Sequence, residues 1–168
     1  MAVKLTTIQV LDIVSAFVFS TLSATTVVAL NNGAPIALEQ QQSQTFTANL
    51  KGSNEVPPVD TLATGTAKLQ VSSNGKDLNY NLSAMNLNGF MMAHIHQGKA
   101  GENGQPLTAP LSIGKGKITS SDLQGPLAGK QISDLVNIIR NGQAYVNVHT
   151  DQNQNGEIRG QIISTGSS

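Results

Sequence analysis

The sequence predicts an all-β fold of antiparallel strands with one short helix. The chain of 168 residues contains 16 glycines, and only 4% of its residues are aromatic and 12% are charged. This composition, without long helix-forming runs, is typical of turn-rich β domains. Apolar and polar residues also alternate in several short segments, which indicates strands with one buried face. The length fits a single domain with a modest core.

Charge and cysteine content exclude several classes of function. The 10 basic and 10 acidic residues give a formal net charge of +0, so no basic field is present to attract nucleic acid. Cysteine is absent, which excludes disulfides, thiolate metal ligands and a cysteine nucleophile. The serines and acids form no nucleophile motif, so a hydrolytic site is not expected.

Residues 1–30 are predicted to be a signal peptide or an N-terminal membrane anchor. Lys4 precedes an uncharged, largely apolar stretch at residues 13–30, with small residues near Ala29 that suit a signal peptidase. The same stretch is long enough to span a bilayer, which takes roughly 17–25 residues, so an uncleaved anchor is the alternative. Both readings make the folded part secreted or otherwise extracytoplasmic. Residues 31–44 are polar and predict a linker.

The first half of the expected domain contains three alternating segments. Residues 45–50 predict a strand, and the two prolines within residues 51–59 predict an extended loop. Residues 64–71 and 78–82 predict a hairpin through Asn74-Gly75, a pair typical of a tight type I′ turn. The expected buried face of this hairpin consists of Ala67, Leu69 and Val71 against Leu78, Tyr80 and Leu82.

The second half of the domain mixes strands, glycine-rich loops and one helix. The helix is expected at residues 132–142, where Ser133 can cap the N-terminus and Gly142 can end the last turn. The other expected elements are a histidine-bearing strand after the turn at 86–89, a loop at 98–106, strands at 107–113, near 117–119 and at 144–150, a loop at 151–155, and a last strand at 156–163 that pairs with 144–150.

The three histidines of the chain suggest a metal site. His94 and His96 are two residues apart in a strand, so they point to the same face. His149 shares a face with Tyr145 and Asn147, and three imidazoles converge if the two strands are neighbours. Imidazole suits copper and zinc. We therefore predict a copper or zinc site formed by His94, His96 and His149.

Polar side chains on the last two strands complete this prediction. Asn147, Glu157 and Arg159 are expected near the histidines, where they would contact a ligand ring and orient it. The alternative is a structural role, in which the histidines bond to the backbone and to Glu157 or Arg159, and these two residues form an ion pair.

Asp151, Asn153 and Asn155, followed by Gly156, have the spacing of the first half of an EF-hand calcium loop. The twelfth position, where an EF-hand has a bidentate acid, is Ile162, so the loop is not an EF-hand. A single carboxylate predicts at most weak calcium binding. The alternative is a hairpin loop whose side chains bond to their own backbone.

Four segments in sequence order resemble the CHRD domain family, a module of secreted proteins. The resemblance covers about residues 45–163 and implies an extracytoplasmic, immunoglobulin-like antiparallel β-sandwich or barrel, without a generally assigned reaction. Relatives often carry a proline before the last strand, where this chain has residues 151–156. The matching motifs are Leu50-x-Gly52-x-Asn54-Glu55-Val56-Pro57-Pro58-Val59, Ala93-His94-Ile95-His96-x-Gly98-x-x-Gly101-x-x-Gly104, Tyr145-Val146-Asn147-Val148-His149-Thr150 and Gly156-Glu157-Ile158-Arg159-Gly160-Gln161-Ile162.

These observations predict a CHRD domain at residues 45–165 that acts as a binding or structural module at the cell surface. Its expected partner is a protein or surface of unknown identity, with membrane contact only through the N-terminal segment. Two alternatives remain open. One is a small copper-dependent oxidoreductase, and the other is a self-assembling surface or matrix protein in which an edge strand pairs with a second copy.

Overall fold

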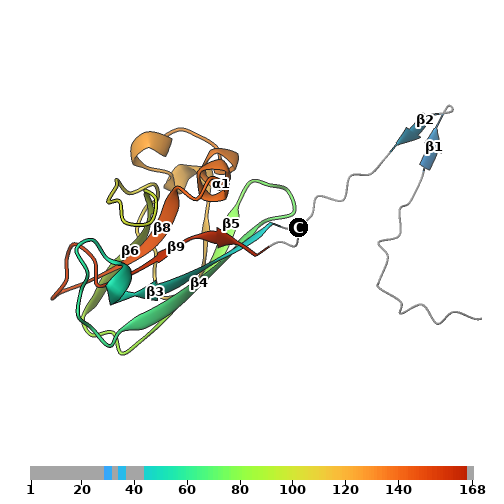
Figure 1. Ribbon diagram of the computed structural model, residues 1–168. Coiled ribbons are helices and arrows are strands. Elements are labelled where there is room, and N and C mark those ends of the chain that lie inside the picture. The colour runs from blue at the N-terminus through green and yellow to red at the C-terminus, as the bar shows by residue number, and fades with distance from the viewer. Residues whose placement is uncertain (1–28, 32–33, 37–43, 166–168) are drawn as a thin grey trace, which may run out of the picture. The chain divides into compact units, whose positions relative to one another are not determined.

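The computed structural model describes residues 29–31, 34–36 and 44–165 (Figure 1). The chain divides into two units, residues 1–40 and 41–168. In the first unit, β1 (Ala29–Asn31) pairs with β2 (Ala34–Ile36) in antiparallel fashion. The predicted signal or anchor and most of the predicted linker lie outside the described residues. Across the described part of the chain, no helix has the length and apolarity needed to cross a membrane.

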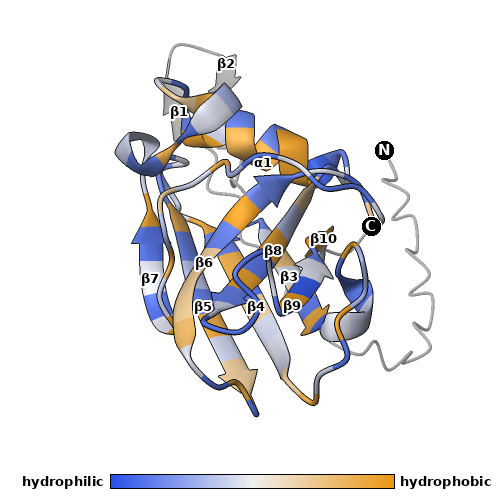
Figure 2. Ribbon diagram, turned by 90° about the vertical axis from the view of Figure 1, so that its left-hand side faces the viewer, coloured by the Kyte–Doolittle hydropathy of each residue, from blue (hydrophilic) through white to orange (hydrophobic). Residues whose placement is uncertain are grey.

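The second unit is built on one antiparallel sheet that curls around an apolar core, with α1 at one end (Figures 1 and 2). The strand order is β6-β8-β9-β3-β4-β5-β7, and β10 pairs with β3. The predicted fold class is confirmed. The elements are β3 (Thr45–Lys51), β4 (Thr64–Val71), β5 (Leu78–Met85), β6 (Phe90–Gln97), β7 (Gly114–Ile118), α1 (Ile132–Arg140), β8 (Ala144–Thr150), β9 (Ile158–Gln161) and β10 (Ile163–Ser164).

The β4–β5 hairpin has the predicted register. Ala67 lies opposite Leu82, and Val71 lies opposite Leu78. All four side chains are buried in the core, while Tyr80, opposite Leu69, is partly buried against it. The alternating pattern therefore identified the buried face of this hairpin.

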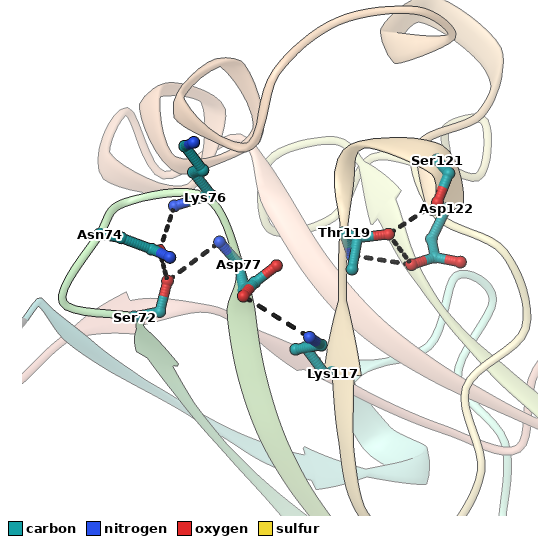
Figure 3. Close-up of polar contacts among 8 residues, drawn as sticks. All are labelled: Ser72, Asn74, Lys76, Asp77, Lys117, Thr119, Ser121 and Asp122. Carbon is teal, nitrogen blue, oxygen red and sulfur yellow. Dashed lines mark hydrogen bonds and ion pairs between the residues drawn. The ribbon is translucent and has the colours of Figure 1, made fainter.

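The turn between β4 and β5 differs from the prediction. Gly75 has a positive φ of 70°, but Asn74 does not. A type I′ turn needs a positive φ at both residues, so the predicted turn type was wrong. Asn74 instead accepts hydrogen bonds through its side chain from the Ser72 hydroxyl (2.7 Å) and the Lys76 amide (3.0 Å), as Figure 3 shows. These bonds hold a wider loop, because an Asn side chain can replace a backbone turn. Asp77 then pairs with Lys117 of β7 at 3.6 Å.

The segment predicted as a strand at residues 107–113 forms only isolated bridges. Its amides at Leu107 and Leu111 donate to the carbonyls of Ile95 and Ala93, each at 2.7 Å, so the segment covers the free edge of β6. Pro110 has no N–H to donate, which prevents a continuous ladder. A regular strand begins only at Gly114, the first residue of β7.

Helix α1 lies where the sequence predicts it, but with a different cap. Its N-cap is Gln131, whose amide donates to the Asp134 carboxylate at 2.9 Å, so Ser133 lies in the first turn and the predicted cap was wrong. Gly142, with φ of 67°, follows the helix as predicted. The buried side chains of α1 include Leu135 and Ile139, which pack the helix against the core.

We predict that Leu82→Ala lowers the free energy of unfolding by about 2–5 kcal/mol, because it leaves a cavity in a closed core. The Leu82 side chain is only 1% exposed. Met85→Ala is the control on the same strand, where the side chain is 68% exposed, and it should change stability by about 0.5 kcal/mol or less. Urea unfolding followed by circular dichroism measures both values. Equal losses would contradict the core position of Leu82.

Candidate metal centre

The three histidines lie on one polar face of the β6–β8–β9 part of the sheet. The antiparallel register places Met92 opposite His149, His94 opposite Asn147, and His96 opposite Tyr145. The residues between them, including Ala93, Ile95, Val146 and Val148, are buried in the core on the opposite face. The expectation that the two histidine strands are neighbours is confirmed.

The three imidazole rings form a nearly equal-sided triangle. The ring centroids are 5.5 Å apart for His94 and His96, 5.4 Å for His94 and His149, and 5.6 Å for His96 and His149. One ring nitrogen from each residue lies within 4.8 Å of the other two. His96 is buried, and the other two rings are half-buried. The predicted cluster therefore exists.

Two backbone carbonyls set the tautomers of His96 and His149. The Nδ1 atom of His96 bonds to the Gly104 carbonyl at 2.9 Å, and Nδ1 of His149 bonds to the Gln154 carbonyl at 2.9 Å. Because a carbonyl only accepts, both Nδ1 atoms must carry the proton. In the neutral ring the lone pair is then on Nε2.

One nitrogen of each ring is buried without a hydrogen-bond partner. Nε2 of His96, Nε2 of His149 and Nδ1 of His94 are buried and unpaired. Two Nε2 lone pairs cannot bond to each other, and each unpaired buried polar atom costs about 1–3 kcal/mol. The Nε2 lone pairs of His96 and His149 are therefore available to a hydrogen-bond donor or to a metal ion.

Electrostatics keep the rings neutral near pH 7. Burial, together with the charges of the neighbouring His96 and His149, lowers the pKa of His94 to about 4. Burial also lowers the pKa of His96 and of His149, although the hydrogen bonds to Gly104 and Gln154 act in the opposite direction. Neutral imidazole is the form that coordinates a metal.

Arg159 holds the loop that orients His96. Its side chain is 2% exposed, and its guanidinium lies 3.4 Å from the centroid of the Tyr145 ring, on which His96 also stacks. The Tyr145 hydroxyl accepts a bond from the Gly104 amide at 3.2 Å. The guanidinium donates to three loop oxygens: the carbonyls of Lys99 (2.8 Å) and Glu102 (2.7 Å), and Oδ1 of Asn103 (3.1 Å).

Glu157 is buried but forms no ion pair with Arg159. The predicted ion pair between these two described residues was therefore wrong. The carboxylate of Glu157 accepts bonds from the hydroxyls of Thr61 (2.8 Å) and Thr150 (2.7 Å). Although burial raises its pKa, these bonds and one from Asn153 lower it below the ordinary value. Hydroxyl donors thus replace the expected guanidinium.

Asn147 donates to the Asn155 carbonyl at 3.4 Å rather than to a histidine. The ring partners of His96 and His149 are backbone carbonyls, for which a sequence carries no side-chain signal. An indirect effect of Asn147, Glu157 and Arg159 on metal affinity stays a prediction.

A second buried carboxyl, Glu55, lies beside Asn147 and was not identified from the sequence. Oε1 of Glu55 and Oδ1 of Asn147 are both buried without a partner. A Cβ atom at Gly156 would lie 2.8 Å from the first and 2.6 Å from the second. Burial raises the pKa of Glu55 to about 7, although the charge of Arg159 lowers it.

The loop with calcium-like spacing is closed by its own bonds. The amide of Asn153 donates to the Thr150 hydroxyl at 3.1 Å, and the amide of Gly156 donates to the Asn153 carbonyl at 3.0 Å. Asp151 and Asn155 are exposed. Weak calcium binding by Asp151, Asn153 and Asn155 stays a prediction.

A cavity of about 210 Å³ opens onto the histidine cluster, and its lining includes residues for which the sequence predicts no role at the site. These are Met91, Met92, Pro106 and Gln154, beside the three histidines. A larger hollow of about 640 Å³ lies over β3, β4, β5 and β7, but its lining contains no histidine and no acid. Of these two hollows, the smaller one therefore contains the possible metal ligands.

We predict that Glu55 makes stability fall as pH rises. In the folded protein the carboxyl group of Glu55 keeps its proton up to about pH 7, because its pKa is raised. In the unfolded chain it loses the proton near the ordinary pKa of 4.5. Between these values the native state binds more protons, so the stabilisation present at low pH is lost through this window. The effect is at most about 3–4 kcal/mol.

Chemical unfolding between pH 4.5 and 8 measures this effect as the difference between the wild-type protein and Glu55→Gln. Asp60→Asn, at an exposed position of the same loop, is the control and should follow the wild-type curve. A wild-type minus Glu55→Gln difference that does not change with pH would contradict the assignment.

The family of the chain follows from comparison with known proteins. No curated protein and no solved structure gives a significant match. The family model described as the CHRD domain matches residues 46–162, which is more than half of the chain and includes β6, β8 and all three histidines. The chain therefore belongs to the CHRD domain family.

Proposed function

We propose that this protein is an extracytoplasmic CHRD module that binds one copper or zinc ion through His94, His96 and His149. The observation that carries the proposal is the set of three unpaired, buried ring nitrogens, one from each histidine. The tautomers of two of the rings, His96 and His149, are fixed by hydrogen bonds to backbone carbonyls. A purely structural cluster would use these nitrogens in hydrogen bonds, since buried polar atoms are normally paired.

The dimensions of the cluster suit a metal after a small adjustment. Ligands at about 2.0–2.1 Å from a tetrahedral ion lie roughly 3.3 Å from one another. One ring nitrogen of each histidine lies within 4.8 Å of the other two, so rotations of the side chains can bring the three to this spacing. The adjacent cavity of about 210 Å³ leaves room for a fourth ligand.

The N-terminal sequence supports a location outside the cytoplasm. A basic residue followed by the apolar stretch at residues 13–30 is typical of an export signal or anchor. A surface module with neutral histidine ligands needs no thiols, and the chain has none. The binding partner at the surface is proposed to be a protein or another surface component.

We expect the metal-stripped full chain to bind one Cu(II) or Zn(II) ion, and expect His94→Ala and His149→Ala each to weaken binding about 100-fold or more, equivalent to about 2.7 kcal/mol. Isothermal calorimetry measures the affinities, and circular dichroism confirms folding. Asn81→Ala, at an exposed position on β5, is the control. Wild-type affinity no higher than that of the histidine variants would overturn the proposal.

Arg159→Met should weaken metal binding by about 10–100-fold without touching a ligand, because support of ligand orientation has effects of this size. The substitution removes three hydrogen bonds to the loop that carries the Gly104 carbonyl. Arg140→Met, at the exposed end of α1, is the matched control and should bind like the wild type. Unchanged affinity in a folded Arg159→Met protein would show that the loop does not support the site.

A further inference from the structure

Met92 is on the same face and at the same cavity as the three histidines. It precedes His94 by two residues on β6, and the register places it directly opposite His149 on β8. Its side chain is half-buried and lines the cavity into which the cluster opens. A thioether side chain therefore lines the same cavity as the three rings.

The charges around the cavity also restrict the ion. Its lining consists of methionine, histidine, proline and glutamine, without a carboxylate. The group of possible metal ligands likewise contains only the three histidines. Arg159 adds positive charge beside the cluster, because its guanidinium lies 3.4 Å from the centroid of the Tyr145 ring on which His96 stacks. A divalent ion would keep its full charge of +2 in this half-buried place, and the desolvation cost of a charge rises steeply in such surroundings.

A monovalent soft ion needs no carboxylate ligand and has a smaller desolvation cost than a divalent ion. Thioether and imidazole ligands suit Cu(I), whereas zinc sites use cysteine, histidine and carboxylate ligands. A neutral ligand set leaves Cu(I) with a net charge of only +1. Met92 is therefore the residue that distinguishes copper from zinc at this site.

We propose that the Met92 sulfur completes the coordination by His94, His96 and His149, and that the resulting site selects Cu(I) over Zn(II). This inference rests on the proposed metal-binding function and adds the identity and oxidation state of the ion. Met91 also lines the cavity, but it lies at the irregularity in β6 and is 43% exposed. Met91 is therefore the control residue for the assignment of Met92 as the sulfur ligand.

The test measures the affinity of the full chain for Cu(I), under anaerobic conditions, by competition with a chromophoric Cu(I) chelator. Zn(II) affinity is measured in parallel with a zinc dye. We expect Met92→Leu to lower Cu(I) affinity about tenfold or more, while Zn(II) affinity changes less than about threefold. Met85→Leu, at an exposed position on β5, should behave like the wild type.

X-ray absorption of the Cu(I) form adds a direct signature. The wild-type spectrum should contain a sulfur neighbour of copper that is absent in Met92→Leu and present in Met91→Leu. Equal Cu(I) affinity in the wild type and Met92→Leu, with binding lost in His149→Ala, would overturn the role of Met92 and leave the histidine site intact. If the sulfur neighbour of copper disappears from the spectrum of Met91→Leu and not from that of Met92→Leu, the sulfur ligand is Met91 and the proposed role of Met92 is overturned. Absence of all metal binding in the wild type would overturn both proposals.

Discussion

The register between β6 and β8 is the constraint on which the site depends. It places His149 opposite Met92 and next to His94, while Ile95 and Val148 point into the core. A shift of one residue would turn every side chain of a strand to the other face, so burial of the apolar face fixes the positions of the histidines. The packing of the core and the geometry of the cluster are two results of one pairing.

Buried polar residues next to the sheet determine how the rings are oriented. Arg159 and Tyr145 hold the loop from which Gly104 reaches His96, and the loop after β8 supplies the Gln154 carbonyl to His149. Satisfied hydrogen bonds of this kind make buried polar groups rigid. The three ring nitrogens are buried without a partner, as are Oε1 of Glu55 and Oδ1 of Asn147, and unpaired buried polar atoms of this kind call for an explanation such as a bound ion.

The sequence predicted the sheet and the cluster because both depend on periodicity. Alternation identified β3, β4, β5 and β8, and the spacing of His94 and His96 placed both rings on one face. Periodicity did not predict the features that depend on individual hydrogen bonds. Asn74 uses its side chain in a wider turn, Pro110 interrupts the segment beside β6, and Glu157 pairs with hydroxyls instead of Arg159. The carbonyl partners of the rings, and the place of Met92 opposite His149, depend on tertiary pairing and leave no pattern in the sequence.

The central claim is that His96 and His149 present Nε2 lone pairs to one metal ion. Long-range proton–nitrogen NMR of the histidine side chains tests it directly in the full chain. Our account predicts that the metal-free protein has the proton on Nδ1 of both rings near pH 7, and that one equivalent of diamagnetic Cu(I) shifts the Nε2 signals of both. Protons on Nε2 in the metal-free protein, or signals that do not respond to Cu(I), would contradict it.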